Sequence, residues 1–391
     1  MAIPLPPLDA FRADRAHSAQ PTADEGAWLQ VALLAHRAAA LPVSERGAHL
    51  EQASALLPGT PQGDAAEKVI AAALQMEDAT RLHLALSTLD GALRLLGETE
   101  FERRGRVLAY QGRVLRQLGD IASAEARYQA AERLGETHGQ RAIVARAWVG
   151  YGILAQVRGN LPEARTQFER VLTENAAPSD SRQVAHHGLM MCASNVGDMD
   201  AAARHAWAAY VESDGFERGA ALHALSELLL NAGEPKAALS GFAAAVRQPI
   251  LPRHELPALG GLAISAVRAM PRAAAARLVN AARFRIDALL ADTYLPYAHA
   301  ATLIELAEAL SQIGSSELSR RTAERARAIA ATHRFNELTF RAEQLQETVT
   351  PTRVREVAAP VYAPPAEIVA AVESLVPFEA LISGDVVLSA V

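Results

Sequence analysis

The sequence predicts an all-α solenoid of about eight antiparallel helix hairpins, and three observations favour this fold class. First, a glycine followed by Asp, Asn or Glu recurs in steps of 40, 38 and 36 residues, at Gly119, Gly159, Gly197 and Gly233. Second, apolar residues recur at the three- and four-residue spacing of a helix face. Third, 50% of the residues are hydrophobic but only 5% are aromatic, which favours close contacts between alanine-rich helices. A period of a few tens of residues is typical of stacked hairpins.

A second pattern follows each of these glycines and reads Ala-x3-aromatic-x2-Ala, with some substitutions. Its residues are Ala124, Tyr128 and Ala131, then Ala164, Phe168 and Val171, then Ala202, Ala206 and Ala209, and finally Ala238, Phe242 and Ala245. Residues four and three apart lie on one helix face. We expect them to form the close contacts between helices.

The N-terminal part begins with a segment rich in proline and polar residues. Residues 1–24 are expected to form an extended leader. From Trp28 the spacing becomes helical, Pro42 ends this helix, and residues 47–57 are expected to return as its hairpin partner. A second hairpin is expected over residues 64–96.

The clearest repeats lie between residues 103 and 247. In each, the first helix is expected to end at the glycine, where a left-handed backbone is accessible without a Cβ atom. The Asp, Asn or Glu that follows can cap the next helix. Pro162 and Pro235 fall near the first turn of that helix, where proline is tolerated, so they support the same boundaries independently.

The repeat signal weakens after residue 247, where Pro249, Pro252 and Pro257 indicate a longer connection. A hairpin is expected over residues 254–286, broken at Met270-Pro271. Another is expected over residues 295–332. The predicted solenoid therefore spans residues 25–347.

Residues 348–391 are expected to form a proline-rich linker and a C-terminal tail. The tail contains a short predicted helix over residues 366–376 and an apolar end from Asp385 to Val391. It can dock on a partner, fold back onto the solenoid or remain disordered.

The composition limits the classes of function. A net charge of −6 argues against broad nucleic-acid binding, which normally requires a basic excess. With one cysteine, Cys192, no intrachain disulfide is possible, and a reducing compartment is expected. The sequence has neither a signal-peptide pattern nor an apolar run of the roughly 20 residues that a spanning helix needs. We therefore expect a cytoplasmic protein with no membrane partner, and the sequence predicts no particular oligomeric state.

Several repeat positions carry a resemblance to a known family. They are Leu108, Gly112, Leu115, Gly119, Ala124, Tyr128 and Ala131 in the first clear repeat, and Trp148, Tyr151, Gly152, Gly159, Ala164, Phe168 and Val171 in the second. The third repeat has Ala206 at the aromatic position, and the fourth keeps Phe242. This pattern resembles the tetratricopeptide repeat (TPR), clearly over about 145 residues. The repeats depart from the family in their longer spacing and in mostly lacking its closing proline, as at Glu136.

The resemblance implies a right-handed superhelix whose first (A) helices line a concave surface, with second (B) helices behind them. Aligning each repeat on its glycine predicts which side chains face this groove. They are Arg106, Tyr110, Arg113 and Arg116, then Arg146, Ile153 and Gln156, then His187, Met191 and Asn195, and finally His223, Glu227 and Asn231. The predicted groove is basic at one end and carries amide and imidazole groups further along.

This groove predicts a protein or peptide partner, with arginines pairing acidic residues and Asn195 and Asn231 bonding its backbone. The alternative is that these arginines only form a solvated helix face. The carboxylate clamp of chaperone-binding TPR proteins needs Lys and Asn at groove positions that here hold Ala109, Arg113, Gly150, Val184 and Gly188. Only Arg113 could substitute, so that specificity is not expected.

Other chemistry has weaker support. His186, His187, Cys192 and His205 do not have the spacing of a zinc site, and Cys192 lies in an apolar helical stretch that favours a structural thiol. No phosphate-binding glycine motif occurs, and aromatic residues are too sparse around the arginines for nucleic-acid stacking. We therefore expect a non-enzymatic scaffold or adaptor without cofactor or metal. The alternative is a bacterial regulatory protein that senses a ligand or peptide and acts through a separate effector.

Overall fold

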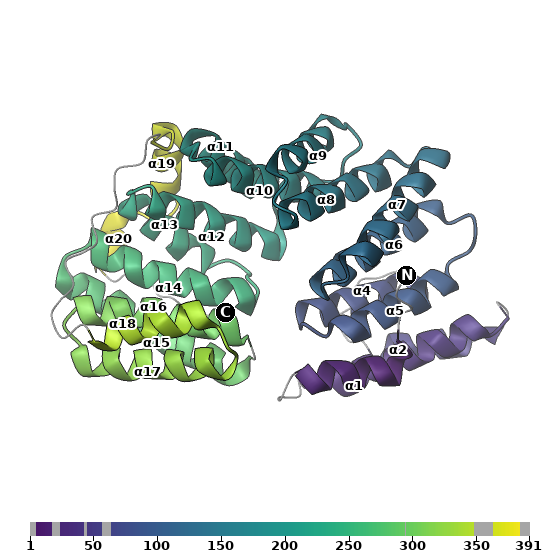
Figure 1. Cartoon of the computed structure of the whole chain (residues 1–391), viewed down its shortest axis with the longest axis horizontal. Helices are drawn as coiled ribbons and strands as arrows, with labels where there is room; N and C mark the ends of the chain where they lie inside the picture. Colours follow the sequence, from purple (N-terminus) through teal and green to yellow (C-terminus); the bar gives the residue numbers. More distant parts are fainter. Residues whose placement is uncertain are drawn as a thin grey trace. The chain divides into compact units, whose positions relative to one another are not determined.

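The computed structural model describes residues 5–17, 24–42, 45–56, 64–293, 295–347 and 363–383, and over these residues the chain is built of helices without strands (Figure 1). The first ten helices are α1 (Pro7–His17), α2 (Glu25–Ala40), α3 (Gly47–Ala55), α4 (Ala65–Asp78), α5 (Leu82–Leu95), α6 (Phe101–Gln117), α7 (Ile121–Thr137), α8 (Arg141–Val157), α9 (Leu161–Thr173) and α10 (Ser179–Asn195). The other ten are α11 (Met199–Glu212), α12 (Gly215–Asn231), α13 (Pro235–Ala245), α14 (Pro252–Ala269), α15 (Arg272–Asp292), α16 (Pro296–Gln312), α17 (Ser316–Thr332), α18 (Asn336–Glu347), α19 (Ala366–Glu373) and α20 (Phe378–Ser383).

Consecutive helices pack against each other in pairs, as the sequence predicted for an all-α hairpin solenoid. The even-numbered helices α4 to α16 are the A helices of their hairpins, and the odd-numbered helices α5 to α17 are the B helices. The chain divides into two compact units, Met1–Gly188 and Leu189–Val391, with the division inside α10. None of the described helices is both long and apolar enough to cross a membrane.

The predicted glycine turns are confirmed by the backbone. Gly119, Gly159 and Gly197 have φ angles of 82°, 74° and 79°. The residue after each glycine donates its amide to a carbonyl five residues earlier, as Asp120 N does to Leu115 O at 3.0 Å. This bond is the Schellman closure of a helix C-terminus, so the A helices end where the sequence placed their ends.

The residue after the glycine also caps the B helix in three of the four clear repeats. The side chains of Asp120, Asn160 and Asp198 each accept a hydrogen bond from the amide three residues later. Glu234 makes no such bond, and Pro235 begins the helix there instead. The turns at Thr80 and Arg334 adopt positive φ without a glycine, which is why the glycine period did not mark them.

Tyr128 of α7 shows how neighbouring hairpins are held together. Its ring is buried between Gly112 of α6 and Gly150 of α8, and a Cβ atom at either glycine would overlap it. Glycine is required at both positions because the ring fills the space that a larger residue would need. One B-helix aromatic residue thereby sets the separation of two successive A helices.

The next hairpins repeat this arrangement and then modify it. Phe168 of α9 lies in the same way against Gly152 and Gly188. In the third repeat, Ala206 replaces the aromatic residue, and the A helix carries Met190 where the earlier repeats have glycine; both are buried in one hydrophobic cluster. In this repeat the large side chain is on the A helix instead of the B helix, so the space between the two helices stays filled.

The structure differs from the predicted extended leader over residues 7–17, which form α1. Pro7 stands at the first helical position, where its missing N–H costs nothing, and Ala10 is buried. The Asp14 carboxylate accepts the amides of His83 at 3.0 Å and Leu84 at 2.9 Å. Because the N-cap residue of α5, Arg81, makes no side-chain cap, Asp14 supplies the cap from another helix.

Two other boundaries differ from the sequence prediction. Pro257, expected in a connection, lies inside α14, in its second turn. The predicted tail helix over residues 366–376 ends at Glu373 as α19, followed by α20. Most of the predicted linker and the apolar end fall within residues 348–362 and 384–391, outside the described residues.

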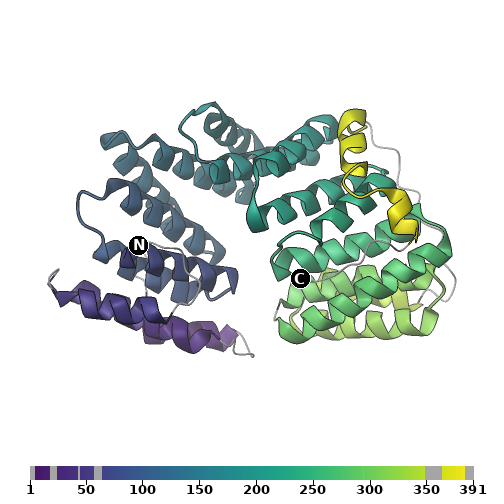
Figure 2. The same cartoon turned by 180° about the vertical axis from the view of Figure 1, so that it is seen from behind.

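The tail folds back onto the solenoid over its described part. Helix α19 packs on α13 and α11, and α20 packs on α15 (yellow in Figures 1 and 2). Buried Ser240 of α13 lies 2.8 Å and 2.9 Å from the carbonyl oxygens of Val372 and Val376, and it accepts the Val376 amide at 3.0 Å. The Ser240 hydroxyl therefore accepts one tail amide and donates its single proton to one of the tail carbonyls.

Replacing Asp14 by Ala is expected to lower the free energy of unfolding of the first unit by about 1 kcal/mol, because α5 loses its only side-chain cap. Amide hydrogen exchange at His83 and Leu84 should rise in parallel. Asp9→Ala is the matched control, since Asp9 lies on the same helix with a side chain 55% exposed. Unchanged exchange at both amides in Asp14→Ala would contradict this capping role.

Replacing Ser240 by Ala is expected to loosen α19 by about 1–3 kcal/mol, because it leaves buried backbone groups without partners. Hydrogen exchange at Val376 measures this directly. Exposed Ser374, the C-cap residue of α19, donates its hydroxyl to Ala371 O and provides the control variant Ser374→Ala. Equal exchange rates at Val376 in the two variants would show that Ser240 does not hold the tail.

Candidate functional site

The arginines predicted to line the groove of the first unit are paired with acids of the same chain. Arg106 forms an ion pair with Glu67 of α4. Arg113 contacts Glu77 of α4 at 2.6 Å, and Gln117 also donates to Glu77. Glu77 is only 7% exposed, and Arg113 is the cation that offsets the burial of its carboxylate. The basic surface expected from the sequence is therefore partly neutralised from α4.

Tyr110 of α6 lies beside two of the predicted arginines. Its half-buried ring has the guanidinium of Arg113 at 5.1 Å and that of Arg146 at 5.9 Å from its centroid. Both distances are within the range of a cation–π interaction. Arg146 also pairs with Asp180 of α10 at 2.6 Å. The structure thus brings together Tyr110, Arg113 and Arg146 from two successive A helices.

The other predicted residues of the first unit are less closely associated. Arg116 is half-buried and hydrogen-bonds to Tyr128. Gln156 of α8 donates to the carbonyl of Gly188 at 3.1 Å, and Ile153 is half-buried. His187 of α10 is reached by solvent, yet burial lowers the pKa of its imidazole, so it is expected to be neutral at pH 7.

The predicted residues of the second unit lie on α10 and α12. Met191 is 43% exposed, and Asn195 is exposed but donates to Met191 O at 2.8 Å. The ring of His223 lies 5.9 Å from that of Phe242, and Asn231 is exposed. Glu227 is exposed, yet burial raises the pKa of its carboxyl.

The sequence interpretation missed the acids that pair with the arginines. Arg113 and Glu77 are 36 residues apart, Arg106 and Glu67 are 39, and Arg146 and Asp180 are 34. These separations equal about one repeat. A search for opposite charges one repeat apart would have found them, because equivalent positions of stacked A helices are neighbours.

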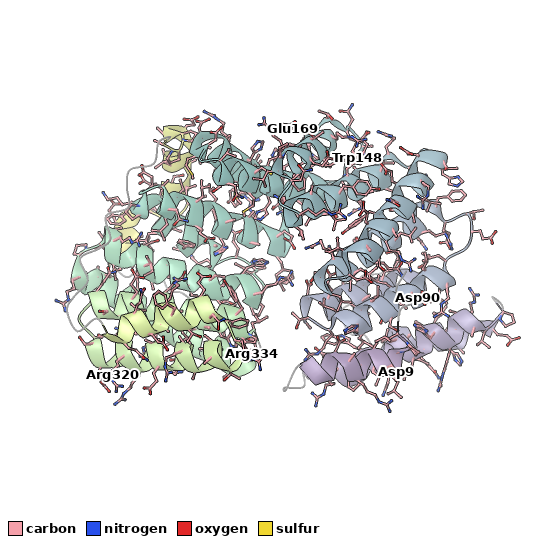
Figure 3. The ribbon with its side chains drawn as sticks, viewed as in Figure 1. Asp9, Asp90, Trp148, Glu169, Arg320 and Arg334 are labelled. Atoms are coloured by element: carbon pink, nitrogen blue, oxygen red, sulfur yellow. The ribbon has the colours of Figure 1, made fainter. Side chains whose placement is uncertain are left out.

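Trp148 of α8, labelled in Figure 3, illustrates a polar cluster behind this surface. Its Nε1 donates to Glu132 of α7 at 3.0 Å, and the hydroxyl of Tyr151 donates to the same carboxylate at 2.8 Å. Burial, together with this bond, raises the pKa of Tyr151. Glu132 thus fixes two aromatic side chains of the A helix to the B helix before it.

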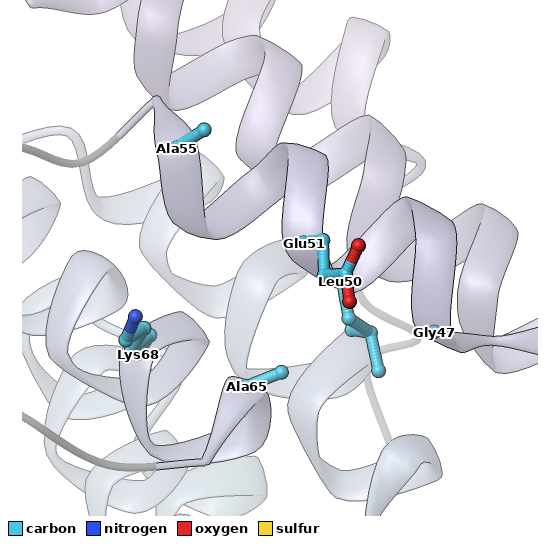
Figure 4. A pocket seen from close by; sticks show the side chains of 6 residues that line it. All are labelled: Gly47, Leu50, Glu51, Ala55, Ala65 and Lys68. Atoms are coloured by element: carbon cyan, nitrogen blue, oxygen red, sulfur yellow. The ribbon is translucent and has the colours of Figure 1, made fainter.

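A cavity of about 470 Å³ lies elsewhere in the first unit, at α3 and α4 (Figure 4). Its lining residues are Gly47, Leu50, Glu51, Ala55, Ala65 and Lys68. None of them belongs to the predicted groove set. Among the described residues, no group of three or more His, Cys, Asp or Glu is placed to hold a metal ion, and Cys192 is a buried free thiol.

The fold of this chain is similar to that of solved repeat proteins. No family model and no curated protein matches the chain. Among solved structures it is similar to a Signal Transduction ATPase with Numerous Domains (STAND) protein with a tetratricopeptide repeat sensor from Pyrococcus horikoshii, at 11% identity and TM-score 0.52, over 86% of this chain and 52% of that one. This chain therefore spans about half the length of that protein. A tetratricopeptide repeat protein from Parabacteroides merdae is similar at 14% identity and TM-score 0.39, over 71% of this chain and 98% of that one.

The chain therefore has the TPR-like fold that the repeats indicated. At these identities the likeness concerns the fold alone. What this chain binds therefore has to be inferred from the side chains on its own A helices.

Replacing Arg113 by Ala is expected to lower the free energy of unfolding by about 1–2 kcal/mol, because it leaves the buried Glu77 charge without its cation. Adding Glu77→Gln should recover most of this loss, which a double-mutant cycle in urea measures. Independent, additive losses in the cycle would show that the pair does not stabilise the fold.

Proposed function

We propose that this chain is a non-enzymatic interaction protein that binds an acidic polypeptide segment on the A-helix surface of its first unit. The observation that carries the proposal is the half-buried Tyr110 ring between Arg113 and Arg146. Stacked helical hairpins present extended surfaces of this kind to partners. An aromatic ring flanked by two guanidinium groups suits a segment that carries a carboxylate beside an apolar side chain.

The two arginines have different parts in this proposal. The Asp180 side chain, the partner of Arg146, is 54% exposed, and exposed ion pairs contribute at most about 1 kcal/mol. A carboxylate of the partner can therefore replace Asp180 at small cost. Arg113 is needed by buried Glu77 and is expected to stay with it. Arg146 is thus the exchangeable cation and Tyr110 the contact surface, with Gln156 and His187 further along the A helices.

A second candidate is a regulatory protein that senses a ligand or peptide and acts through a separate effector. It is favoured by the fold match over 86% of this chain to a protein whose repeats are described as a sensor, which is an analogy of fold. Small-angle scattering with and without a bound peptide separates the candidates. A sensor is expected to change its radius of gyration on binding, and a passive scaffold is not.

Binding can be tested with random 12-residue peptides displayed on phage and selected on the immobilised full chain. Selected peptides are expected to be rich in Asp and Glu. Their affinity, measured by fluorescence polarisation, should fall at least about tenfold in Tyr110→Ala and in Arg146→Glu, a loss of about 1.4 kcal/mol, and should weaken with salt.

The matched control is Arg165→Glu, because Arg165 lies on the B helix α9 with a side chain 69% exposed. This variant makes the same change of charge away from the proposed surface. It should bind the selected peptides within twofold of the parent. Peptides that bind Arg146→Glu and Tyr110→Ala as tightly as the parent would refute the site.

A further inference from the structure

In the second unit, Glu305 of α16 has one side-chain oxygen atom that forms no hydrogen bond with any described residue. The residue is half-buried, its Oε2 atom is withdrawn from solvent, and this atom has no hydrogen-bond partner among the described residues. Buried carboxylates normally accept hydrogen bonds or pair with a cation. The residues around Glu305 therefore indicate what kind of group could pair with its carboxylate.

The A helices before α16 leave room for this carboxylate and add negative charge. Gly260 of α14 lies beneath it, and a Cβ atom at Gly260 would overlap Oε2. Glu227 of α12 repels it electrostatically, as does Glu308 of α16 itself. Arg341 of α18 attracts it, but Arg341 is exposed and forms no ion pair with it in the described structure. Two acids thus add negative charge around Glu305, and Arg341 offsets it without forming an ion pair in the described structure.

We propose that Glu305, together with Glu227, forms a site for an organic cation, an ammonium or guanidinium group, on the A-helix surface of the second unit. This site is separate from the Tyr110–Arg146 surface and does not depend on the function proposed for it. Such a cation brings one positive charge and several N–H donors, which matches one unpartnered carboxylate and a second acid nearby. Calcium, by contrast, takes six to eight oxygen ligands.

Proton release is expected to accompany binding. Burial and the neighbouring Glu227 raise the pKa of Glu305 to about 8, so the free site is mostly protonated at pH 7. A cation binds the ionised carboxylate and displaces the proton. The affinity should therefore rise with pH toward about 8 and fall about tenfold for each pH unit well below it.

Two probes test the site and distinguish a free amine from a protein side chain. They are n-butylammonium and the blocked peptide acetyl-Gly-Lys-Gly-amide, titrated into the full chain by calorimetry at pH 8.5 and pH 6.5. At least one probe is expected to bind saturably at pH 8.5 and about 25-fold more weakly at pH 6.5, following the ionised fraction. Binding of the peptide identifies a lysine-type side chain as ligand, and binding of butylammonium alone identifies a free amine.

The decisive variant is Glu305→Gln, which keeps the size of the side chain and removes its charge. It should weaken binding at least tenfold at pH 8.5 and abolish the pH dependence. Glu324→Gln on the B helix α17, where the side chain is 58% exposed, is the matched control and should bind within twofold of the parent, while Glu227→Gln should weaken binding severalfold. No saturable binding of either probe at pH 8.5, or binding unchanged in Glu305→Gln, would overturn the proposal without affecting the peptide site of the first unit.

Discussion

The solenoid depends on one steric constraint, the fit of a B-helix aromatic ring between glycines of two successive A helices. Tyr128 and Phe168 each fill such a space, and a methyl group at any of the facing glycines would overlap the ring. Because interiors are close-packed, the ring fixes the distance between adjacent A helices. Those helices then hold their outward side chains at a constant spacing. The A-helix surface that we assign to binding is therefore a consequence of the core behind it.

The same stacking determines how charges on that surface are satisfied. Equivalent positions on neighbouring A helices are about one repeat apart, so an acid on one helix meets an arginine on the next, as Glu77 meets Arg113. Such pairs remove much of the positive potential that the arginines suggest. The pairs differ in the burial of the acid. Buried Glu77 holds its arginine, whereas exposed Asp180 can release Arg146 for a partner. Under the proposed function, the burial of the acid therefore decides which arginine can pair with a partner.

The repeat architecture could be predicted from the sequence because turn glycines and small residues act locally. Gly119 and Asp120 close and cap helices within a few residues, and such signals are visible in one stretch of sequence. The α1 cap on α5 could not be predicted, because Asp14 bonds to amides about 70 residues away. The pairing of the arginines with acids was not predicted, because each pairing acid lies one repeat away. That these side chains line a binding groove stays a prediction.

Glu305 differs from the A-helix acids of the first unit, which pair with an arginine about one repeat away. Arg341 follows it after 36 residues, the same separation as between Glu77 and Arg113. In the first unit this spacing produces an ion pair, whereas Arg341 stays exposed and Glu305 keeps an unpartnered oxygen. Gly260 contributes to the difference, because the carboxylate can lie over a glycine of α14 rather than extend toward α18. A cation that supplies N–H donors would give Glu305 the kind of partner that Glu67, Glu77 and Asp180 find in arginines of the chain itself. Arg341 then competes with the ligand for one carboxylate, so Arg341→Ala should tighten binding of the cation, and weaker binding in that variant would show that Arg341 forms part of the site.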